Sequence, residues 1–213
     1  MTPIKICGIT RFEDAELAAR LGAASVGFVF WPRSPRFVEA AVAAEILGAL
    51  PPHVTGVGVF VDQPVEEVNA IADQVGLGAV QLHGSEPESV CARCTRRVIK
   101  ALRLSAGSTA DAVDTVWPDA TVLVDVFDPV RMGGTGRQVD WTVAAQIARR
   151  RRTILSGGLR ADNVSEAVRQ VAPYGLDVSS GVESQPGIKA PDRMAALFAA
   201  VRGTVSARRG AQG

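Results

Sequence analysis

Residues 57–84, VGVFVDQPVEEVNAIADQVGLGAVQLHG, hold one complete unit of the pattern that decides the fold. Two short apolar segments, Val57–Val61 and Ala79–Leu82, flank Val65–Val75, in which apolar residues recur at three- and four-residue spacing. Short Val-rich segments are typical of buried strands, and the spacing in the middle segment is typical of a helix that buries one face. Pro64 and the two glutamates that follow Val65 mark the start of that helix. The stretch therefore predicts a strand–helix–strand unit.

The same alternation fills most of the chain. We expect strands at Ile4–Cys7, Ser25–Trp31, Val57–Val61, Ala79–Leu82, Val98–Leu102, Thr121–Val126, Thr153–Leu155 and Leu176–Val178. We expect helices at Phe12–Leu21, Glu39–Leu50, Val65–Val75, Glu86–Thr95, Thr109–Val116, Trp141–Arg149, Asn163–Val171 and Asp192–Val201. Strands that alternate with helices run parallel and are joined by right-handed crossovers. Because no segment resembles a polar edge strand, the sequence favours a closed (β/α)8 TIM barrel of the α/β class over an open doubly wound sheet.

The composition fits a single globular domain. The chain has 213 residues, of which 47% are hydrophobic and 21% charged, values that argue against disorder and against a fibrous repeat. We assign residues 1–203 to the barrel and expect the small, polar stretch 204–213 to form a disordered C-terminal tail.

Charge and hydropathy exclude several classes of partner. The formal net charge is +1, which predicts neither a nucleic-acid footprint nor a patch for an anionic membrane. No apolar run approaches the roughly 18–20 residues that a membrane-spanning helix needs. The N-terminus shows no secretory signal, and three cysteines do not suggest a disulfide framework. These observations predict a soluble, compact, cytoplasmic protein.

Polar residues gather where the predicted strands end. Active sites of (β/α)8 barrels lie at the C-terminal ends of the strands. The residues at those ends are Cys7, Arg33, Arg36, Asp62, Gln81, His83, Asp125, Ser156, Gly157, Gly158, Asp177, Ser179, Ser180 and Gly181. The opposite ends offer mainly Gly, Ala and Pro, so this asymmetry favours a small-molecule enzyme.

Two small-residue loops carry the strongest chemical signal. Ser156–Leu159 and Ser179–Glu183 follow the seventh and eighth predicted strands and include Gly157, Gly158, Ser180 and Gly181. Such loops present backbone N–H groups beside a helix start, which is how a barrel holds a phosphate monoester. The alternative is that glycine merely permits tight turns. The occurrence of both loops at the two expected places favours phosphate binding.

Two strand-end residues are candidates for proton transfer. Cys7 ends the first strand and is either a small buried hydrophobic residue or, once deprotonated, a base. Asp125 shares a strand face with Leu123, which places its carboxyl group in the barrel interior, where burial is costly unless the group is paired or functional. Asp128, just before Pro129, is a rival that could be only a turn residue.

Other polar residues leave alternatives open. Arg33 and Arg36 lie in a proline-rich loop, and each is either a carboxylate or phosphate ligand or a solvated charge. Gln81 and His83 either contact substrate or pack inside the barrel.

Two further motifs do not predict a cofactor. Cys91 and Cys94 lack a second pair of metal ligands, so we expect no metal site there. The glycine-rich loop Gly133–Gly136 lacks the helix of a dinucleotide fingerprint, and a loop that is mobile or covers the substrate is the better interpretation.

Taken together, the motifs resemble those of the phosphoribosylanthranilate isomerase family. The matching segments are Lys5–Thr10, Gly27–Arg36, Gly58–Asp62, Val80–Gly84, Leu123–Asp125, Gly133–Gly136, Asp140-Trp141, Leu155–Leu159, Asn163, Asp177–Glu183 and Pro186-Gly187. They occur in order between about residues 4 and 202, and only the Arg-rich stretch 149–152 and the C-terminal tail fall outside the family pattern.

The resemblance implies an Amadori rearrangement of a phosphoribosyl substrate without a cofactor or metal. It assigns Asp125 as general acid, Cys7 as general base and Arg36 as the ligand of the anthranilate carboxylate. The loops Gly157-Gly158 and Ser180-Gly181 would hold the phosphate, and we place Gln81, His83 and Asp177 in the substrate site as well. The protein would be a monomer or a homodimer.

Two other functions compete with this one. The isomerase of histidine biosynthesis shares the phosphate loops and the chemistry, but its base would be an Asp where Cys7 stands. A phosphosugar-binding barrel without catalysis is the alternative from a different class. The presence of both Cys7 and Asp125 argues against it.

Overall fold

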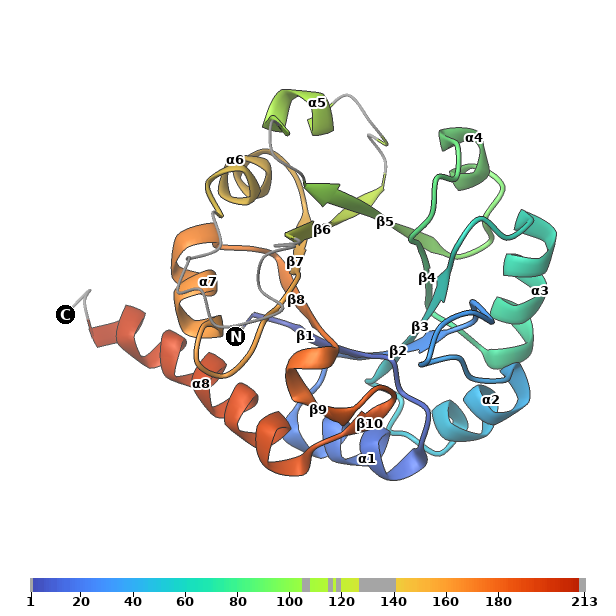
Figure 1. Cartoon of the computed structure of the whole chain (residues 1–213), viewed down its shortest axis with the longest axis horizontal. Coiled ribbons are helices and arrows are strands. Elements are labelled where there is room, and N and C mark those ends of the chain that lie inside the picture. Colours follow the sequence, from blue (N-terminus) through green and yellow to red (C-terminus); the bar gives the residue numbers. More distant parts are fainter. Residues whose placement is uncertain (1, 105–107, 115–116, 118–119, 127–140, 211–213) are drawn as a thin grey trace.

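The eight predicted apolar segments form the eight parallel strands of one closed barrel (Figure 1). The computed structural model describes residues 2–104, 108–114, 117, 120–126 and 141–210. The strands are β1 (Ile4–Cys7), β2 (Ser25–Val29), β3 (Thr55–Phe60), β4 (Ala79–Leu82), β5 (Arg97–Leu104), β6 (Thr121–Val126), β7 (Thr153–Ser156) and β8 (Gly175–Val178). Each strand pairs with the next in chain order, and the parallel ladder between β1 and β8 closes the ring. The predicted TIM-barrel fold is confirmed.

Helices surround the barrel on its outer side (Figure 1). They are α1 (Phe12–Leu21), α2 (Ala40–Gly48), α3 (Val65–Val75), α4 (Glu88–Cys91), α5 (Ala110–Asp114), α6 (Thr142–Arg150), α7 (Val164–Val171) and α8 (Pro191–Gly210). Gly22 and Gly76 end α1 and α3 in the left-handed conformation, with φ of 98° and 75°. Glycine adopts this conformation without the steric cost that other residues carry, so the chain turns sharply back into the next strand.

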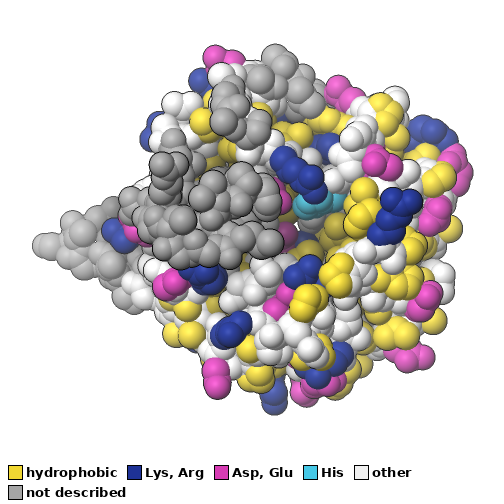
Figure 2. Space-filling model, viewed as in Figure 1, with side chains coloured by type: hydrophobic (Ala, Val, Ile, Leu, Met, Phe, Trp, Pro, Cys, Tyr) yellow, Lys and Arg dark blue, Asp and Glu magenta, His cyan; other side chains and the backbone are white. Residues whose placement is uncertain are grey.

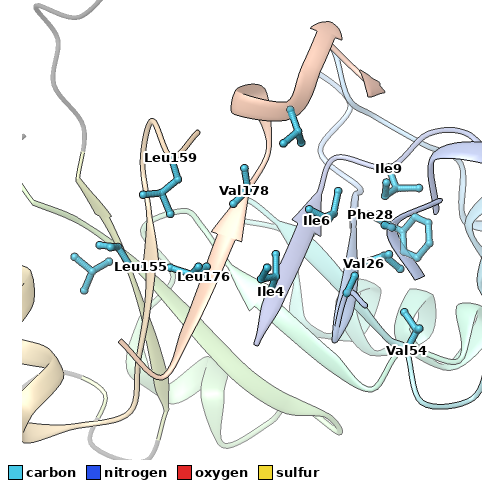
Figure 3. Close-up of a cluster of buried hydrophobic side chains, with 14 of the residues drawn as sticks. Ile4, Ile6, Ile9, Val26, Phe28, Val54, Leu155, Leu159, Leu176 and Val178 are labelled. Carbon is cyan, nitrogen blue, oxygen red and sulfur yellow. The ribbon is translucent and has the colours of Figure 1, made fainter. Parts of the chain in front are cut away.

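Strand alternation sorts the side chains into two layers. One set packs against the helices and includes Ile4, Ile6, Val26 and Phe28, each at most 1% exposed (Figure 3). The other set fills the barrel interior, and its hydrophobic members include Val57, Ala79, Ile99, Ala101, Leu123 and Ile154. Leu123 therefore faces inward while its neighbours on β6 face the helices, as the alternation predicts.

Helix α4 is shorter than the sequence predicts. We expect a helix over 86–95, but the structure has only Glu88–Cys91 in that conformation, with Pro87 as N-cap. Glu86 turns inward instead, where Oε1 accepts hydrogen bonds from the backbone N–H groups of Asp62 and Gly84, each at 3.0 Å. Its Oε2 pairs with the buried Lys100 at 2.6 Å. These contacts hold the loop after β4, and they take Glu86 out of the predicted helix.

Helix α8 is longer than predicted. The helix continues to Gly210, past the predicted end at Val201. The division at residue 203 and the disorder of 204–213 stay predictions. Within the described ranges, no helix is both long and apolar enough to cross a membrane.

A small hairpin that the sequence analysis does not predict follows β8. The 3-10 turn η1 (Ser180–Val182) leads into β9 (Glu183–Gln185), which pairs antiparallel with β10 (Ile188–Lys189). Gly187 lies in the turn with φ of 83°, a conformation that favours glycine. The hairpin lies beside α1 (Figure 1), and the backbone N–H of Lys189 donates to Asp14 Oδ2 at 3.1 Å. It thereby brings two charged side chains, Glu183 and Lys189, to the end of β1.

Candidate active site at the mouth of the barrel

A cavity of about 630 Å³ opens at the C-terminal ends of the strands. It is lined by every residue that the sequence assigns to the site: Cys7, Arg36, Gln81, His83, Asp125, Gly157, Gly158, Asp177, Ser180 and Gly181. Figure 2 shows a histidine, cationic side chains and acidic side chains together at the centre of this face. The structure thus brings residues from strands far apart in the sequence into one concave, charged pocket. This is the usual place for ligand binding in a barrel.

The two small-residue loops lie against each other by their backbones. A Cβ added at Gly181 would lie only 1.8 Å from the carbonyl oxygen of Leu159, so only glycine fits there. Gly157 and Gly158 take φ of 97° and 59°, in the left-handed region. Asn163, the N-cap residue of α7, donates from Nδ2 to Gly158 O at 3.0 Å and accepts from the N–H of Arg160 at 2.8 Å. The loop is therefore fixed at a helix start, an arrangement suited to a phosphate.

Cys7 is buried at the end of β1 beside a lysine. The pKa of the Cys7 thiol is raised, because burial and the Asp177 carboxylate raise it and the charge of Lys5 lowers it only in part. Lys5 points into the barrel, where Nζ donates to Gln81 Oε1 at 2.8 Å and to Asp177 Oδ1 at 2.9 Å. Cys7 therefore lies between the apolar side chains of Val29 and Val59 and the buried charges of Lys5 and Asp177.

The hydrogen bond from Lys5 determines the orientation of the Gln81 side-chain amide. Because Oε1 of Gln81 accepts from Lys5, its Nε2 remains to donate to His83 Nδ1, at 2.9 Å. His83 Nδ1 is then an acceptor, and the ring proton of the neutral imidazole is on Nε2. Burial lowers the pKa of His83, so the ring is neutral at physiological pH. Gln81 is thus held inside the barrel, and His83 lines the cavity with an oriented ring.

Asp125 is partly buried at the end of β6. Burial raises the pKa of its carboxyl group, and Asp177 raises it further, whereas His83 and Arg103 lower it. Arg103 pairs with Asp125 in the β5–β6 register and lines the same cavity. A carboxyl group with a raised pKa at a cavity wall is suited to donating a proton.

Arg36 already has a carboxylate partner in this structure. Its Nε and Nη2 donate to the two oxygens of Glu183 at 2.8 and 2.6 Å. Lys189 Nζ also donates to Glu183 Oε1, at 2.8 Å, and to Cys7 O, at 2.5 Å. Burial alone would raise the pKa of Glu183, but the hydrogen bonds from Arg36 and Lys189 lower it. The guanidinium is therefore fixed at two of its nitrogens, and no described residue accepts a hydrogen bond from Nη1, which can bind a ligand.

Sequence reasoning missed four charged residues of this site: Lys5, Arg103, Glu183 and Lys189. Lys5 had a detectable signal, because a residue two positions before Cys7 shares its strand face. The Pro186-Gly187 pair marks the turn that brings Glu183 and Lys189 together.

Of the other strand-end candidates, Ser156 and Ser179 line the cavity, whereas the rest lie outside its lining or outside the described residues. Arg33 is exposed and does not line the cavity, and Asp62 instead accepts a hydrogen bond from the N–H of Ser85 at 2.6 Å. Asp128 and the loop Gly133–Gly136 lie outside the residues that the structure describes. Within the described ranges, no three His, Cys, Asp or Glu side chains gather as a metal site.

The family model that matches this chain and the curated relatives of the chain carry the same name. The family model described as N-(5′-phosphoribosyl)anthranilate (PRA) isomerase matches residues 4–200. The chain is 48% identical over 189 residues to the N-(5′-phosphoribosyl)anthranilate isomerase of Pelobacter propionicus, covering 89% of this chain and 90% of that protein.

Solved structures agree with the sequence comparison. The phosphoribosyl anthranilate isomerase of Thermotoga maritima superimposes with a TM-score of 0.86 at 38% identity, covering 95% of this chain and 100% of that chain. A phosphoribosyl anthranilate isomerase solved in complex with reduced 1-(o-carboxyphenylamino)-1-deoxyribulose 5-phosphate matches with a TM-score of 0.84 at 37% identity, with the same coverage of both chains.

The contact between the two loops can be tested at Gly181. In Gly181→Ala the new methyl group meets the carbonyl oxygen of Leu159, so the loops must separate. We expect the affinity for inorganic phosphate, measured by calorimetric titration, to fall by about 10-fold or more, equivalent to losing one charge-assisted hydrogen bond. Gly48→Ala is the control, because a Cβ there meets nothing within 4 Å. Unchanged phosphate affinity in Gly181→Ala would place the anion elsewhere.

Proposed function

The chain belongs to the N-(5′-phosphoribosyl)anthranilate isomerase family, and we propose that its barrel mouth catalyses that family's reaction. The reaction converts N-(5′-phosphoribosyl)anthranilate to 1-(2-carboxyphenylamino)-1-deoxyribulose 5-phosphate, an Amadori rearrangement in tryptophan biosynthesis. One observation carries the proposal: a single cavity holds a thiol on β1, a carboxyl group on β6 and the paired glycine loops after β7 and β8. This set supplies a base, an acid and an anchor for a phosphate.

The cavity offers a place for each part of the substrate. We assign the phosphate to the loops at Gly157-Gly158 and Ser180-Gly181. Val29, Val59 and Trp31 pack with Cys7 and form an apolar wall of the cavity suited to the anthranilate ring. Arg36 also lines the cavity, and we assign its Nη1 as the ligand for the anthranilate carboxylate.

Asp125 is the proposed general acid. Its carboxyl group protonates the ring oxygen of the ribose while the bond between that oxygen and C1′ breaks. The nitrogen lone pair forms the C1′=N bond of a protonated Schiff base, and Asp125 is left as a carboxylate. The raised pKa of Asp125 increases the fraction that carries the proton before this step.

Cys7 is the proposed general base. Its thiolate removes the proton from C2′, and the electrons of that C–H bond form C1′=C2′ as the C1′=N electrons return to nitrogen. The product is a neutral enolamine, which becomes the ketone when O2′ loses its proton and C1′ gains one. Proton transfer by one positioned group is typically worth about 10²–10⁴-fold in rate.

The proposed function also implies what the protein binds, how it assembles and where it acts. We infer a small-molecule phosphoribosyl substrate rather than a nucleic acid or a membrane, since the net charge is only +1. A monomer or a homodimer in the cytoplasm fits this function. The isomerase of Thermotoga maritima is described as dimeric.

Turnover of phosphoribosylanthranilate, followed by the loss of its fluorescence, tests the proposal directly. We expect the wild-type protein to be active, and we expect Asp125→Asn to lower kcat by about 10²-fold or more with little change in KM, because shape is kept and the transferable proton is lost. Cys7→Ser should fold normally but turn over poorly, because a hydroxyl is a far weaker base than a thiolate.

Asp128→Asn is the matched control for the acid. It should stay within a few-fold of the wild-type rate when both variants are compared in single-turnover experiments. A larger loss in Asp128→Asn than in Asp125→Asn would reject our choice of acid. Full activity in Cys7→Ser would reject the base.

Arg36 provides a second, independent test. Loss of a hydrogen bond to a charged group costs about 1.5–3 kcal/mol, so Arg36→Ala should lower kcat/KM by about 10–150-fold. Arg33→Ala should have a much smaller effect, because Arg33 is exposed and outside the cavity lining. Glu183→Gln tests whether Arg36 acts through its contact with substrate or through its ion pair with Glu183. This variant weakens the ion pair but leaves the guanidinium group. An equal loss in Glu183→Gln and Arg36→Ala would contradict a direct contact between Arg36 and substrate.

A further inference from the structure

Lys5 is a buried charge that the mechanism above does not use. The residue is only 3% exposed, and its partners Gln81 and Asp177 are 1% and 5% exposed. Its ammonium group donates to the amide oxygen of Gln81 and to the carboxylate of Asp177, on two other strands. An ion pair of this kind is costly to bury, and replacing it with well-packed apolar residues is often neutral or stabilising. Its place inside the barrel therefore needs a reason other than fold stability.

The space around Lys5 is shared with the Cys7 sulfur. Gly27 is the register partner of Cys7 on the neighbouring strand β2. A Cβ added at Gly27 would lie 2.9 Å from Cys7 Sγ and 3.1 Å from Lys5 Nζ. The missing side chain thus leaves a space into which both the thiol and the ammonium group project, so the two groups lie close together beside β2.

Several charges from different elements act on Cys7. Asp177 of β8 opposes formation of a thiolate, while Lys5 of β1 and Lys189 of β10 favour it. Arg36, in the loop after β2, also interacts with Cys7. Among these charges, that of Lys5 has the largest effect on the thiol.

We propose that Lys5 is a positioning residue for Cys7: held by Asp177 and Gln81, its ammonium group stabilises the thiolate that removes the proton from C2′. The inference rests on the role of Cys7 in the proposed function. Lys5 transfers no proton itself. When the sulfur takes the proton from C2′, the Lys5–Asp177 pair stays intact, and the thiol that forms is neutral.

The partners of Lys5 keep its charge in place. Burial alone would lower the pKa of Lys5, but the charges of Asp177 and Cys7 raise it above its usual value. The ion pair with Asp177 therefore favours the charged form of Lys5. The same lysine fixes the Gln81 amide and, through it, the tautomer of His83. The ammonium group of Lys5 thus orients the side chains of Gln81 and His83, and it favours the thiolate form of Cys7.

The test removes the positive and the negative charge of the Lys5–Asp177 ion pair in two separate variants. The rate of Cys7 alkylation by iodoacetamide is measured between about pH 6 and 9, with the Cys7 peptide followed by mass spectrometry, since the thiolate is the reactive form. Lys5→Met should slow alkylation at a given pH by about 10-fold or more and move the profile to higher pH, because an opposite charge is lost. Asp177→Asn should accelerate alkylation, because it removes the negative charge and keeps a hydrogen-bond acceptor for Lys5.

Lys100→Met is the matched control. It also breaks a buried Lys–carboxylate pair, but Lys100 lies on β5 and pairs with Glu86. The Cys7 profile should not move in this variant. The inference would be overturned if the alkylation profiles of Lys5→Met and Asp177→Asn shifted in the same direction or did not shift at all. An equal shift in Lys100→Met would also overturn it. If Lys5→Met does not fold, the acceleration expected in Asp177→Asn still decides.

Failure of this inference can be told apart from failure of the proposed function. If Lys5→Met lowers isomerase activity but leaves Cys7 alkylation unchanged, Lys5 does not act through the thiolate, and the function stands. If Cys7→Ser stays fully active, the base assignment is wrong, and the role of Lys5 in catalysis falls with it. Opposite shifts in alkylation, together with an inactive Cys7→Ser, support both.

Discussion

The parallel ladder between β1 and β8 closes the barrel, and the site depends on the register of that ladder. In this register Lys5 is paired with Asp177, a residue 172 positions away, and their side chains form an ion pair inside the barrel. The same closure sets Cys7 at the end of β1 close to the loop after β8. A shift of one residue would turn Lys5 and Cys7 toward the helices and bring Ile4 and Ile6 inward. The hydrophobic contacts of Ile4 and Ile6 with the helix layer therefore also fix the chemistry of the mouth.

Two networks of charged side chains lie near Cys7. Lys5, Asp177 and Gln81 lie inside the barrel and act on the thiol and on His83. Glu183, Arg36 and Lys189 form the second network at the end of β1, where Glu183 binds both cations and Lys189 also donates to the backbone carbonyl of Cys7. Each buried carboxylate is paired with at least one cation, which offsets the cost of burying the charges. The networks hold the reactive groups in place before substrate arrives, which is what efficient proton transfer requires.

The sequence predicts the strands and the interior position of Asp125 well because both follow from periodicity. Alternation alone places Leu123 and Asp125 on the inner face of β6. The same rule applied to Lys5 would have placed it beside Cys7, but a lysine is usually exposed, and its burial depends on Asp177 and Gln81 from distant strands. Helix α4 differs for a similar reason, because Glu86 binds the distant Lys100 instead of extending the helix. Contacts between residues far apart in the sequence decide these cases, and periodicity carries no information about them.

In the proposed complex, one substrate spans the cavity from the glycine loops to Arg36, with its C2′ beside the Cys7 sulfur and Asp125 within reach of the ribose. A crystal structure of this protein with reduced 1-(o-carboxyphenylamino)-1-deoxyribulose 5-phosphate tests this most directly. We predict phosphate oxygens on the backbone N–H groups of Gly157-Gly158 and Ser180-Gly181, and the carboxylate on Arg36. Cys7 Sγ should be the protein atom that faces C2′. A phosphate bound at Arg36, or a C2′ out of reach of Cys7, would contradict the account.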